Sequence, residues 1–308
     1  MTEVTDYRDY LSRSDEHLRK VDPLVMNLLV AKSIPSLASL NVQCYVDLRD
    51  EWAAALGQRL TAVEPKFYQN PLRYRSHLSY FRMLVLCEFV DRKLGLAYKE
   101  DQRDATVVHY TDPTDLFLNG VMDTRRGTCG NMAALHMVLA WRLGWPVSLA
   151  CVKAHFICRY DDGAVTFNVE ATQAGLGHGG MQSPPDHELM LANGLPEIAV
   201  RCGSDLRALT ARELLAVFIG CRARHMADTN HAEEAERDYL LARYLFPTNR
   251  RLYESQTELS IERSEALFEP GEPGSPQDLA GWLRQRFGEA NKRFNAVPDY
   301  VDLGNPIQ

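Results

Sequence analysis

The sequence predicts an α+β protein in which a small antiparallel sheet lies between two helical regions. The first hundred residues carry apolar side chains at helical spacing, as in the stretch from Ser76 to Leu96. Two β-like runs, residues 147–160 and 164–172, flank an Asp-Asp-Gly turn. After Leu209 the helical patterns return and continue through most of the remaining chain. These observations set the order helices, sheet, helices.

The pattern divides the chain into three parts. Residues 1–110 form an N-terminal helical region that we expect to pack as part of the core, residues 111–200 hold the sheet, and residues 201–308 form an all-helical tail. One or two units of a helical repeat are too few for a repeat array, so packing is the expected role of the tail helices. Four tail residues fall at positions typical of the second helix and exit of a tetratricopeptide unit: Ala235, Ala242, Tyr244 and Pro247.

The composition argues against several classes of function. The chain has 308 residues, of which 45% are hydrophobic and 24% charged, as is ordinary for a globular protein. Its net charge of −7 argues against a nucleic-acid partner, because nucleic-acid binding needs a basic surface. No apolar run approaches the ~18 residues that span a bilayer, and the polar N-terminus does not resemble a secretory signal. We therefore expect neither a membrane partner nor export.

The seven cysteines are scattered along the chain, and none forms a Cys-x-x-Cys pair. Their odd number and irregular spacing argue against a disulfide framework or a structural zinc site, so we expect no metal and no cofactor. A reducing cytoplasm is the compartment that this cysteine usage predicts. Most of the seven are expected to be small buried side chains, so a chemical role for any one of them needs local evidence.

Such local evidence exists in the stretch RRGTCGN, residues 125–131. Cys129 precedes an amphipathic pattern that predicts a helix beginning at this residue. The partial positive charge at a helix N-terminus favours a thiolate, and the backbone N–H of Cys129 is a candidate oxyanion donor. Gly127 and Gly130 lack side chains and so let backbone approach closely. A nucleophilic cysteine also needs a base, usually histidine, and a group that orients this base.

His155 is the best-placed base among the nine histidines. If the Asp-Gly pair at 162–163 forms a two-residue type I′ turn, His155 lies opposite Glu170, with Cβ atoms about 4.5–5.5 Å apart. If the turn centres one residue earlier, His155 lies opposite Asn168 instead. In both registers the histidine lies on the less apolar face of the hairpin, away from the packed side. Glu and Asn both orient an imidazole, but a carboxylate also stabilises the imidazolium, which favours Glu170.

Three motifs in this order, GTCGNMAALHMVLAWRLGWPV, KAHFICRYDDG and FNVEAT, resemble the transglutaminase-like superfamily of cysteine enzymes. In that superfamily a cysteine heads a helix packed on a sheet, a histidine opens the next strand, and an acid lies on the neighbouring strand. The resemblance implies Cys129 as the nucleophile, His155 as the base and Glu170 as the acid. The third motif of the superfamily usually ends in Asp-Pro-Thr, but in this chain it ends in Glu-Ala-Thr. Asn168 is therefore an alternative third member of the triad.

The similarity extends beyond these motifs. The helical N-terminal region, the stretch DPTDLFLNGVMDTRRGTCGN and the helical tail resemble bacterial proteins of the SirB1-like branch, many of which lack the cysteine. The resemblance implies a transglutaminase-like core and acyl transfer through a thioacyl-enzyme intermediate. The acyl donor would be a peptide, a protein glutamine or a carrier-bound thioester, and water or an amine would accept the acyl group. The competing hypothesis is a non-catalytic scaffold that binds protein partners through its helical tail.

Other residues near the motifs are weaker candidates. We expect His136 to be a core residue or to support the site, and we interpret the segment 173–196 as a loop that forms a mobile lid. His178 and His187 suggest metal binding, but no ligand spacing supports it. Arg125 and Arg126 could contact an anionic substrate; the alternative is that they lie in a solvated loop or form a salt bridge. Asn119 or Gln182 could supply a second oxyanion donor.

Overall fold

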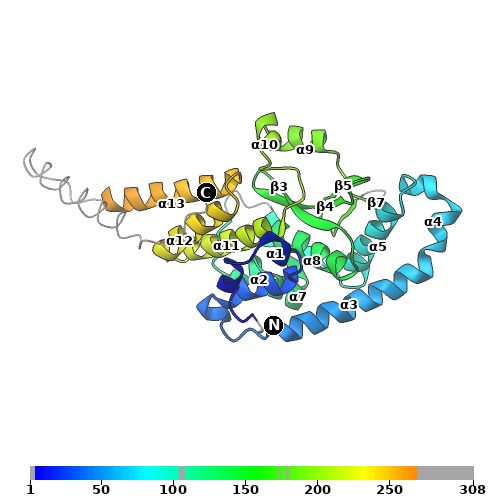
Figure 1. Ribbon diagram of the computed structural model, residues 1–308, viewed down its shortest axis with the longest axis horizontal. Coiled ribbons are helices and arrows are strands. Elements are labelled where there is room, and N and C mark those ends of the chain that lie inside the picture. Colours follow the sequence, from blue (N-terminus) through cyan, green and yellow to red (C-terminus); the bar gives the residue numbers. More distant parts are fainter. Residues whose placement is uncertain (1–3, 104–107, 173, 178–179, 269–308) are drawn as a thin grey trace, which may run out of the picture.

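The computed structural model describes residues 4–103, 108–172, 174–177 and 180–268 of the chain (Figure 1). A three-stranded antiparallel sheet with the strand order β3-β4-β5 lies at its centre. Helices precede and follow this sheet in the sequence, and they also cover it in space. The predicted α+β fold class, with helices on both sides of the sheet in the sequence, is confirmed.

The secondary-structure elements have the following bounds. The helices before the sheet are α1 (Asp15–Leu18), α2 (Pro23–Lys32), α3 (Val42–Val63), α4 (Pro65–Gln69), α5 (Leu78–Arg92), α6 (Glu100–Arg103), α7 (Leu118–Thr124) and α8 (Cys129–Arg142). Those after it are α9 (Asp186–Asn193), α10 (Glu197–Arg201), α11 (Ala211–Asp228), α12 (Ala232–Leu245) and α13 (Arg250–Phe268). The strands are β1 (Ala97–Tyr98), β2 (Arg126–Gly127), β3 (Val147–Val152), β4 (His155–Asp161), β5 (Thr166–Val169), β6 (Leu176–Gly177) and β7 (Gly180–Met181).

Helix α8 packs against β3 and β4 and connects directly to the sheet. Most of its apolar side chains are buried, and Met132, Leu135 and Leu139 are fully buried. Gly144 follows the helix with a left-handed φ of 74°, and its N–H donates to the carbonyl of Trp141 at 2.9 Å. Glycine adopts this conformation without steric cost, so the chain leaves the helix there and turns into β3.

The turn between β4 and β5 differs from the prediction. Instead of two residues, the four residues 162–165 join the strands. The carboxylate of Asp162 accepts the N–H groups of Ala164 at 2.9 Å and Val165 at 2.7 Å, which stabilises the longer turn. The observed register differs from both predicted ones, so both predicted cross-strand pairings of His155 are wrong. The predicted assignment of side chains to the two faces of the hairpin still holds, because a shift by an even number of residues leaves every side chain on its own face.

Both faces of the sheet are covered. One face joins the main hydrophobic cluster together with α8 and α5. The other face forms a second cluster that consists of Ala150, Val152, Ile157, Leu189, Leu195 and Leu206. The expectation that this second face points away from the packed side is wrong, because residues interpreted as a loop form α9, which lies with α10 above the sheet (Figure 1). Pro185 directly precedes helix α9, and Asp186 and Glu188 lie in its first turn, a common pattern for a helix start that the loop interpretation missed.

The C-terminal helices α11, α12 and α13 pack beside one another (Figure 1). Helix α11 also contacts α2, and Arg222 of α11 forms a buried ion pair with Asp238 of α12. Apolar residues of α11, α12 and α13 belong to the same hydrophobic cluster as those of α2 and α8, so the described part of the tail is packed onto the core. No helix in the described ranges has both the length and the apolar character that crossing a membrane requires.

Candidate active site

Cys129 is the first residue of α8, and a set of buried hydrogen bonds fixes this helix start. The N–H of Thr128 donates to Oδ1 of Asn131 at 2.7 Å. Oγ1 of Thr128 donates to the carbonyl of Asp115 at 2.9 Å, and Nδ2 of Asn131 donates to the same carbonyl at 3.0 Å. The polar groups of a helix start need such partners when they are buried. The thiol is therefore presented from a rigid position.

The two glycines beside the cysteine have different surroundings. A Cβ on Gly127 would lie 2.5 Å from Cγ of Met132 and 2.7 Å from Oδ1 of Asn131, so only glycine fits there. This close approach serves packing inside the protein. A Cβ on Gly130 would lie 3.7 Å from the Phe156 ring, an ordinary contact. Gly130, with Cys129, lines the cavity described below.

His155 begins β4 directly after a tight turn that the sequence did not reveal. The run predicted as one strand over 147–160 is broken by Lys153 and Ala154, which form a two-residue turn between β3 and β4. Lys153 has a left-handed φ of 58°, and its N–H donates to the buried carboxylate of Asp205 at 2.6 Å. Glycine is the residue expected at a left-handed first turn position, which explains why the turn was missed.

Glu170 orients His155 even though the two residues are not direct cross-strand neighbours. Nε2 of His155 lies 2.7 Å from Oε2 of Glu170. The other carboxylate oxygen accepts hydrogen bonds from the backbone N–H of Thr172 at 3.1 Å and from its Oγ1 at 2.8 Å. The backbone N–H of Glu170 donates to the carbonyl of Gln182 at 2.9 Å. The acid is therefore held in place from three directions just beyond the end of β5.

The side chain of Cys129 completes this group, because it lies close enough to His155 to raise the pKa of the imidazole. Burial lowers the pKa of His155, but the hydrogen bonds to Cys129 and Glu170 and their negative charges outweigh burial and raise the pKa to about 10. Burial raises the pKa of Glu170, yet the hydrogen bonds from His155 and Thr172 dominate and lower that pKa. The site therefore favours a protonated imidazole between a carboxylate and the thiol sulfur.

Asn168, the alternative third member, has other partners. Its Oδ1 accepts a hydrogen bond from Arg159 at 2.8 Å, and its Nδ2 donates to the carbonyl of Pro184 at 3.0 Å and to Asp186 at 2.7 Å. Asn168 is only 2% exposed. The structure thus places this amide between β4 and the start of α9, while Glu170 is the residue that it places on His155.

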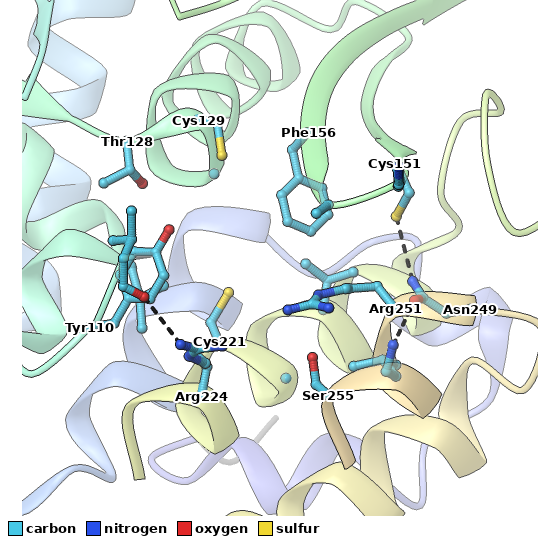
Figure 2. Close-up of a pocket in the computed structure, with 18 of the residues that line it drawn as sticks. Tyr110, Thr128, Cys129, Cys151, Phe156, Cys221, Arg224, Asn249, Arg251 and Ser255 are labelled. Atoms are coloured by element: carbon cyan, nitrogen blue, oxygen red, sulfur yellow. Dashed lines mark hydrogen bonds between the residues drawn. The ribbon is translucent and has the colours of Figure 1, made fainter. Parts of the chain in front are cut away.

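A cavity of about 560 Å³ opens beside Cys129 (Figure 2). One wall comes from the start of α8, the β3–β4 turn and Phe156; the facing wall comes from α11, α12 and α13. Figure 2 shows the thiol of Cys129 between Thr128 and Phe156, with Cys221 and Ser255 on the facing helices. Burial, followed by the charge of Cys129, raises the pKa of Tyr110, so a protonated phenol lies in the same cavity.

Sequence reasoning missed the whole helical wall. Arg224 of α11, Arg251 of α13 and Asn249 line the cavity, and none of them belongs to a motif near the cysteine. Helical periodicity does not reveal which distant helix faces a given site, so no local signal identified them. None of the cavity residues falls in the described parts of the segment 173–196, which contains β6, β7 and α9. The structure therefore gives no support to a lid in this segment.

Two histidines of the sequence analysis lie away from the cavity. His136 is fully buried, with Nδ1 2.9 Å from the carbonyl of Met132 and Nε2 3.3 Å from that of Ala174. Burial lowers the pKa of His136, as for a neutral core residue. His187 is exposed on α9, and His178 lies outside the described residues. Within the described ranges, no three side chains of His, Cys, Asp or Glu form a group that could hold a metal ion.

The other polar candidates also point elsewhere. The guanidinium of Arg125 lies 4.3 Å from the ring centre of Trp52 in α3. Arg126 donates to the carbonyl of Gly95 at 3.1 Å. Asn119 is buried in α7. These three side chains, and that of Gln182, are not among those that line the cavity, so the structure supports neither the anion contact nor the second oxyanion donor proposed for them.

Comparison with protein families places these features in a known context. The model of the family described as the transglutaminase-like superfamily matches residues 50–216, more than half of the chain. The matched region runs from α3 into α11 and contains Cys129, His155 and Glu170. The comparisons with curated proteins and with solved structures gave no match.

Proposed function

The chain belongs to the transglutaminase-like superfamily, and on this premise we propose that it is a cysteine-dependent acyltransferase or hydrolase. The substrate is an amide or a thioester, and the reaction passes through a thioacyl-enzyme intermediate. One observation carries the proposal: the imidazole of His155 is hydrogen-bonded to the carboxylate of Glu170 and lies close enough to the thiol of Cys129 for the thiol to raise its pKa, beside a cavity. Nucleophile, base and orienting acid are the three groups that thiol catalysis uses.

The first half-reaction joins the acyl group to Cys129. The thiolate attacks the carbonyl carbon, and a carbon–sulfur bond forms while the carbonyl oxygen becomes an oxyanion. The N–H of Cys129, at the start of α8, is the candidate donor to this oxyanion. The protonated His155 gives its proton to the leaving amine or thiol as the bond between carbonyl carbon and leaving group breaks. The raised pKa of His155 keeps this proton available at neutral pH.

The second half-reaction frees the enzyme. His155, now neutral, takes a proton from a water or an amine as that molecule attacks the thioester carbon, and the carbon–sulfur bond breaks. The sulfur leaves as the thiolate, so the original ion pair with His155 is restored. Water makes the protein a peptidase or amidase, and an amine makes it an amide synthase or transamidase. The triad serves both outcomes.

We also infer that the chain falls within the SirB1-like branch and that its tail is related to tetratricopeptide units. A thiolate nucleophile is protected from oxidation in a reducing compartment, which supports the cytoplasm as its location. The acyl donor, a peptide, a protein glutamine or a carrier-bound thioester, and the amine acceptor stay proposals at the level of chemical class.

Alkylation by iodoacetamide tests the nucleophile. Cys44 and Cys202 are exposed, whereas Cys129 is only partly exposed. If exposure alone controlled alkylation, Cys44 and Cys202 would react first; if the pair with His155 activates the thiol, Cys129 reacts first at pH 7. We expect His155→Ala to slow the alkylation of Cys129 and to leave that of Cys44 unchanged, as measured by peptide mass spectrometry. Equal and slow alkylation of all three would contradict an enzymatic role.

Trapping the intermediate tests the reaction itself. We expect a p-nitrophenyl ester to transfer its acyl group to Cys129, with a matching mass increase on the peptide that contains this residue. Adding an amine such as glycine methyl ester then separates the outcomes, because transfer gives the amide and hydrolysis gives the free acid. Release of p-nitrophenol at the same rate in Cys129→Ala would contradict the thioacyl route.

Exposed apolar side chains on the tail support the alternative role as a binding scaffold. Tyr244 of α12 is 62% exposed and Ile261 of α13 is 52% exposed. Such side chains are common at protein interfaces. The scaffold hypothesis predicts that Cys129→Ala leaves the biological activity of the protein intact, whereas Tyr244→Ser abolishes it. The enzyme hypothesis predicts the opposite pattern.

A further inference from the structure

The charged side chains of the cavity are not balanced. Arg224 is paired with Asp228 at 2.8 Å, and Arg251 is paired with Glu258 at 3.1 Å. Lys153 lines the same cavity, but within the described ranges no carboxylate forms an ion pair with its ammonium group. Lys153 is exposed and therefore offers the cavity one cation that no carboxylate of the described residues pairs with, so a bound anion could form this ion pair.

The backbone conformation gives a second reason to assign a function to Lys153. The residue has a left-handed φ of 58° at the first position of the two-residue turn, where glycine is preferred. A side chain is strained in this conformation, and such strain concentrates at functional sites. Asp205 is only 3% exposed and accepts the N–H of Lys153 at 2.6 Å. This carboxylate thus holds the backbone of the turn, while the side chain of Lys153 is exposed and lines the cavity.

The rest of the lining suits an apolar group. Phe156 lies on the same wall as the thiol (Figure 2), and Val217 of α11 and Leu252 of α13 belong to the facing wall. Burying an apolar chain between such side chains is favourable, at about 25 cal/mol per Å² of apolar surface. The lining therefore combines an apolar surface and a single unpaired ammonium group in the cavity that begins at Cys129.

We propose that this cavity binds the acyl group of the donor, and that this group is an apolar chain whose far end carries a carboxylate paired with Lys153. The inference rests on the proposed function, because the acyl carbon must reach the sulfur of Cys129. It adds a substrate class: a dicarboxylic acid activated at one end as an amide or thioester. A single cation selects one negative charge, while the apolar wall selects the chain between the two ends.

Two esters of equal chain length test this proposal. p-Nitrophenyl hexanoate is neutral, whereas mono-p-nitrophenyl adipate ends in a carboxylate. With both, the bond between sulfur and acyl carbon forms, the bond between acyl carbon and phenolate oxygen breaks, and the released p-nitrophenolate is measured by its absorbance. We expect kcat/KM to be about fivefold higher for the adipate, as for one partly exposed ion pair.

Variants assign the preference to one side chain. Lys153→Gln should bring the ratio of the two kcat/KM values to about one, and Lys153→Glu should favour the hexanoate. Lys153→Gly, which relaxes the turn, should also give a ratio near one while the protein stays folded. Lys66→Gln removes an exposed ammonium group of α4 and should leave the ratio unchanged.

Each other outcome overturns either this inference or the proposed function. A wild-type ratio of one, or a ratio that survives Lys153→Gln, contradicts the carboxylate site. An equal fall with both esters means that Lys153 acts on the thiolate or on the fold, which also contradicts it. If both esters acylate Cys129 at the same rate, the proposed function stands and this inference fails. If neither ester acylates Cys129 in the wild-type protein, the proposed function itself fails.

Discussion

The two walls of the cavity are built in different ways. The wall that carries Cys129 comes from one continuous part of the chain, α8 and the sheet that follows it, and hydrogen bonds fix the start of α8 and the nearby His155. The facing wall comes from α11, α12 and α13, which reach the site through hydrophobic packing against helices far away in the sequence, and an ion pair joins α11 to α12. One wall thus holds reacting groups, and the other shapes the space in front of them.

This difference teaches what each wall controls in the proposed reaction. Hydrogen bonds fix atoms at defined distances, which an attacking sulfur and a proton donor need. Packed helices define a volume, and a change in volume alters which acyl group fits. Substitutions of the reacting groups Cys129, His155 and Glu170 should therefore change the rate for every acyl donor alike. Those on the second wall should change the ranking of donors.

Removing the sulfur has the largest expected effect. We expect Cys129→Ala to lower the rate of ester acylation by at least ~10⁴-fold, because no other group in the triad attacks a carbonyl carbon. Release of p-nitrophenol measures the rate, and peptide mass spectrometry measures the acyl-enzyme. Cys44→Ala, which removes an exposed thiol, is the matched control and should behave as the wild type. An unchanged acylation rate in Cys129→Ala would show that Cys129 is not the nucleophile.

Removing the acid has the next largest effect. We expect Glu170→Gln to slow amide cleavage by about 10²-fold to 10³-fold, because the negative charge that raises the pKa of His155 is lost. In the wild type, His155 is protonated below its pKa and loses this proton as the pH rises through about 10. The alkaline limb of the pH–rate profile should therefore move to lower pH in the variant.

Alkylation by iodoacetamide is the control for this shift. Alkylation needs the thiolate but no proton donor, so in the wild type it should persist above pH 10, where amide cleavage falls. An alkaline limb at the same pH in Glu170→Gln and in the wild type would show that Glu170 does not set the protonation of His155.

Enlarging the cavity at its helical wall tests whether this wall determines which acyl groups fit. Leu252 of α13 is buried and lines the cavity. We expect Leu252→Ala to lower the free energy of unfolding by about 2 kcal/mol and to raise kcat/KM for long acyl chains relative to short ones. Leu259→Ala, at a buried residue of the same helix that does not line the cavity, should cost similar stability without changing the ranking. Equal changes in the ranking for both variants would contradict a specific role for this wall.

The same contrast explains how much the sequence could predict. Cys129 was found because a helix start and two glycines are local signals. His155 and Glu170 were placed on one face because the side-chain period of two survives an even shift in register. The register itself depended on the hydrogen bonds made by Asp162 in the turn, which residue types alone do not determine. The helical wall was missed because the hydrophobic periodicity of a helix does not identify the distant part of the chain that this helix contacts.

Substitution of Lys153, in the turn between β3 and β4, has the smallest expected effect on stability. A non-glycine residue at positive φ is strained by about 1–2 kcal/mol, whereas glycine has a larger entropy in the unfolded chain, which costs roughly 0.5–1 kcal/mol. We therefore expect Lys153→Gly to raise the free energy of unfolding by about 0.5 kcal/mol in urea titrations, with the m-value unchanged. Lys153→Ala also removes the ammonium group but keeps a Cβ at a φ of 58°, so it should give no such gain. Equal stability of the two variants would mean that the backbone is not strained there. The presence of a lysine would then carry no argument for a site, and only the unpaired charge would still support one.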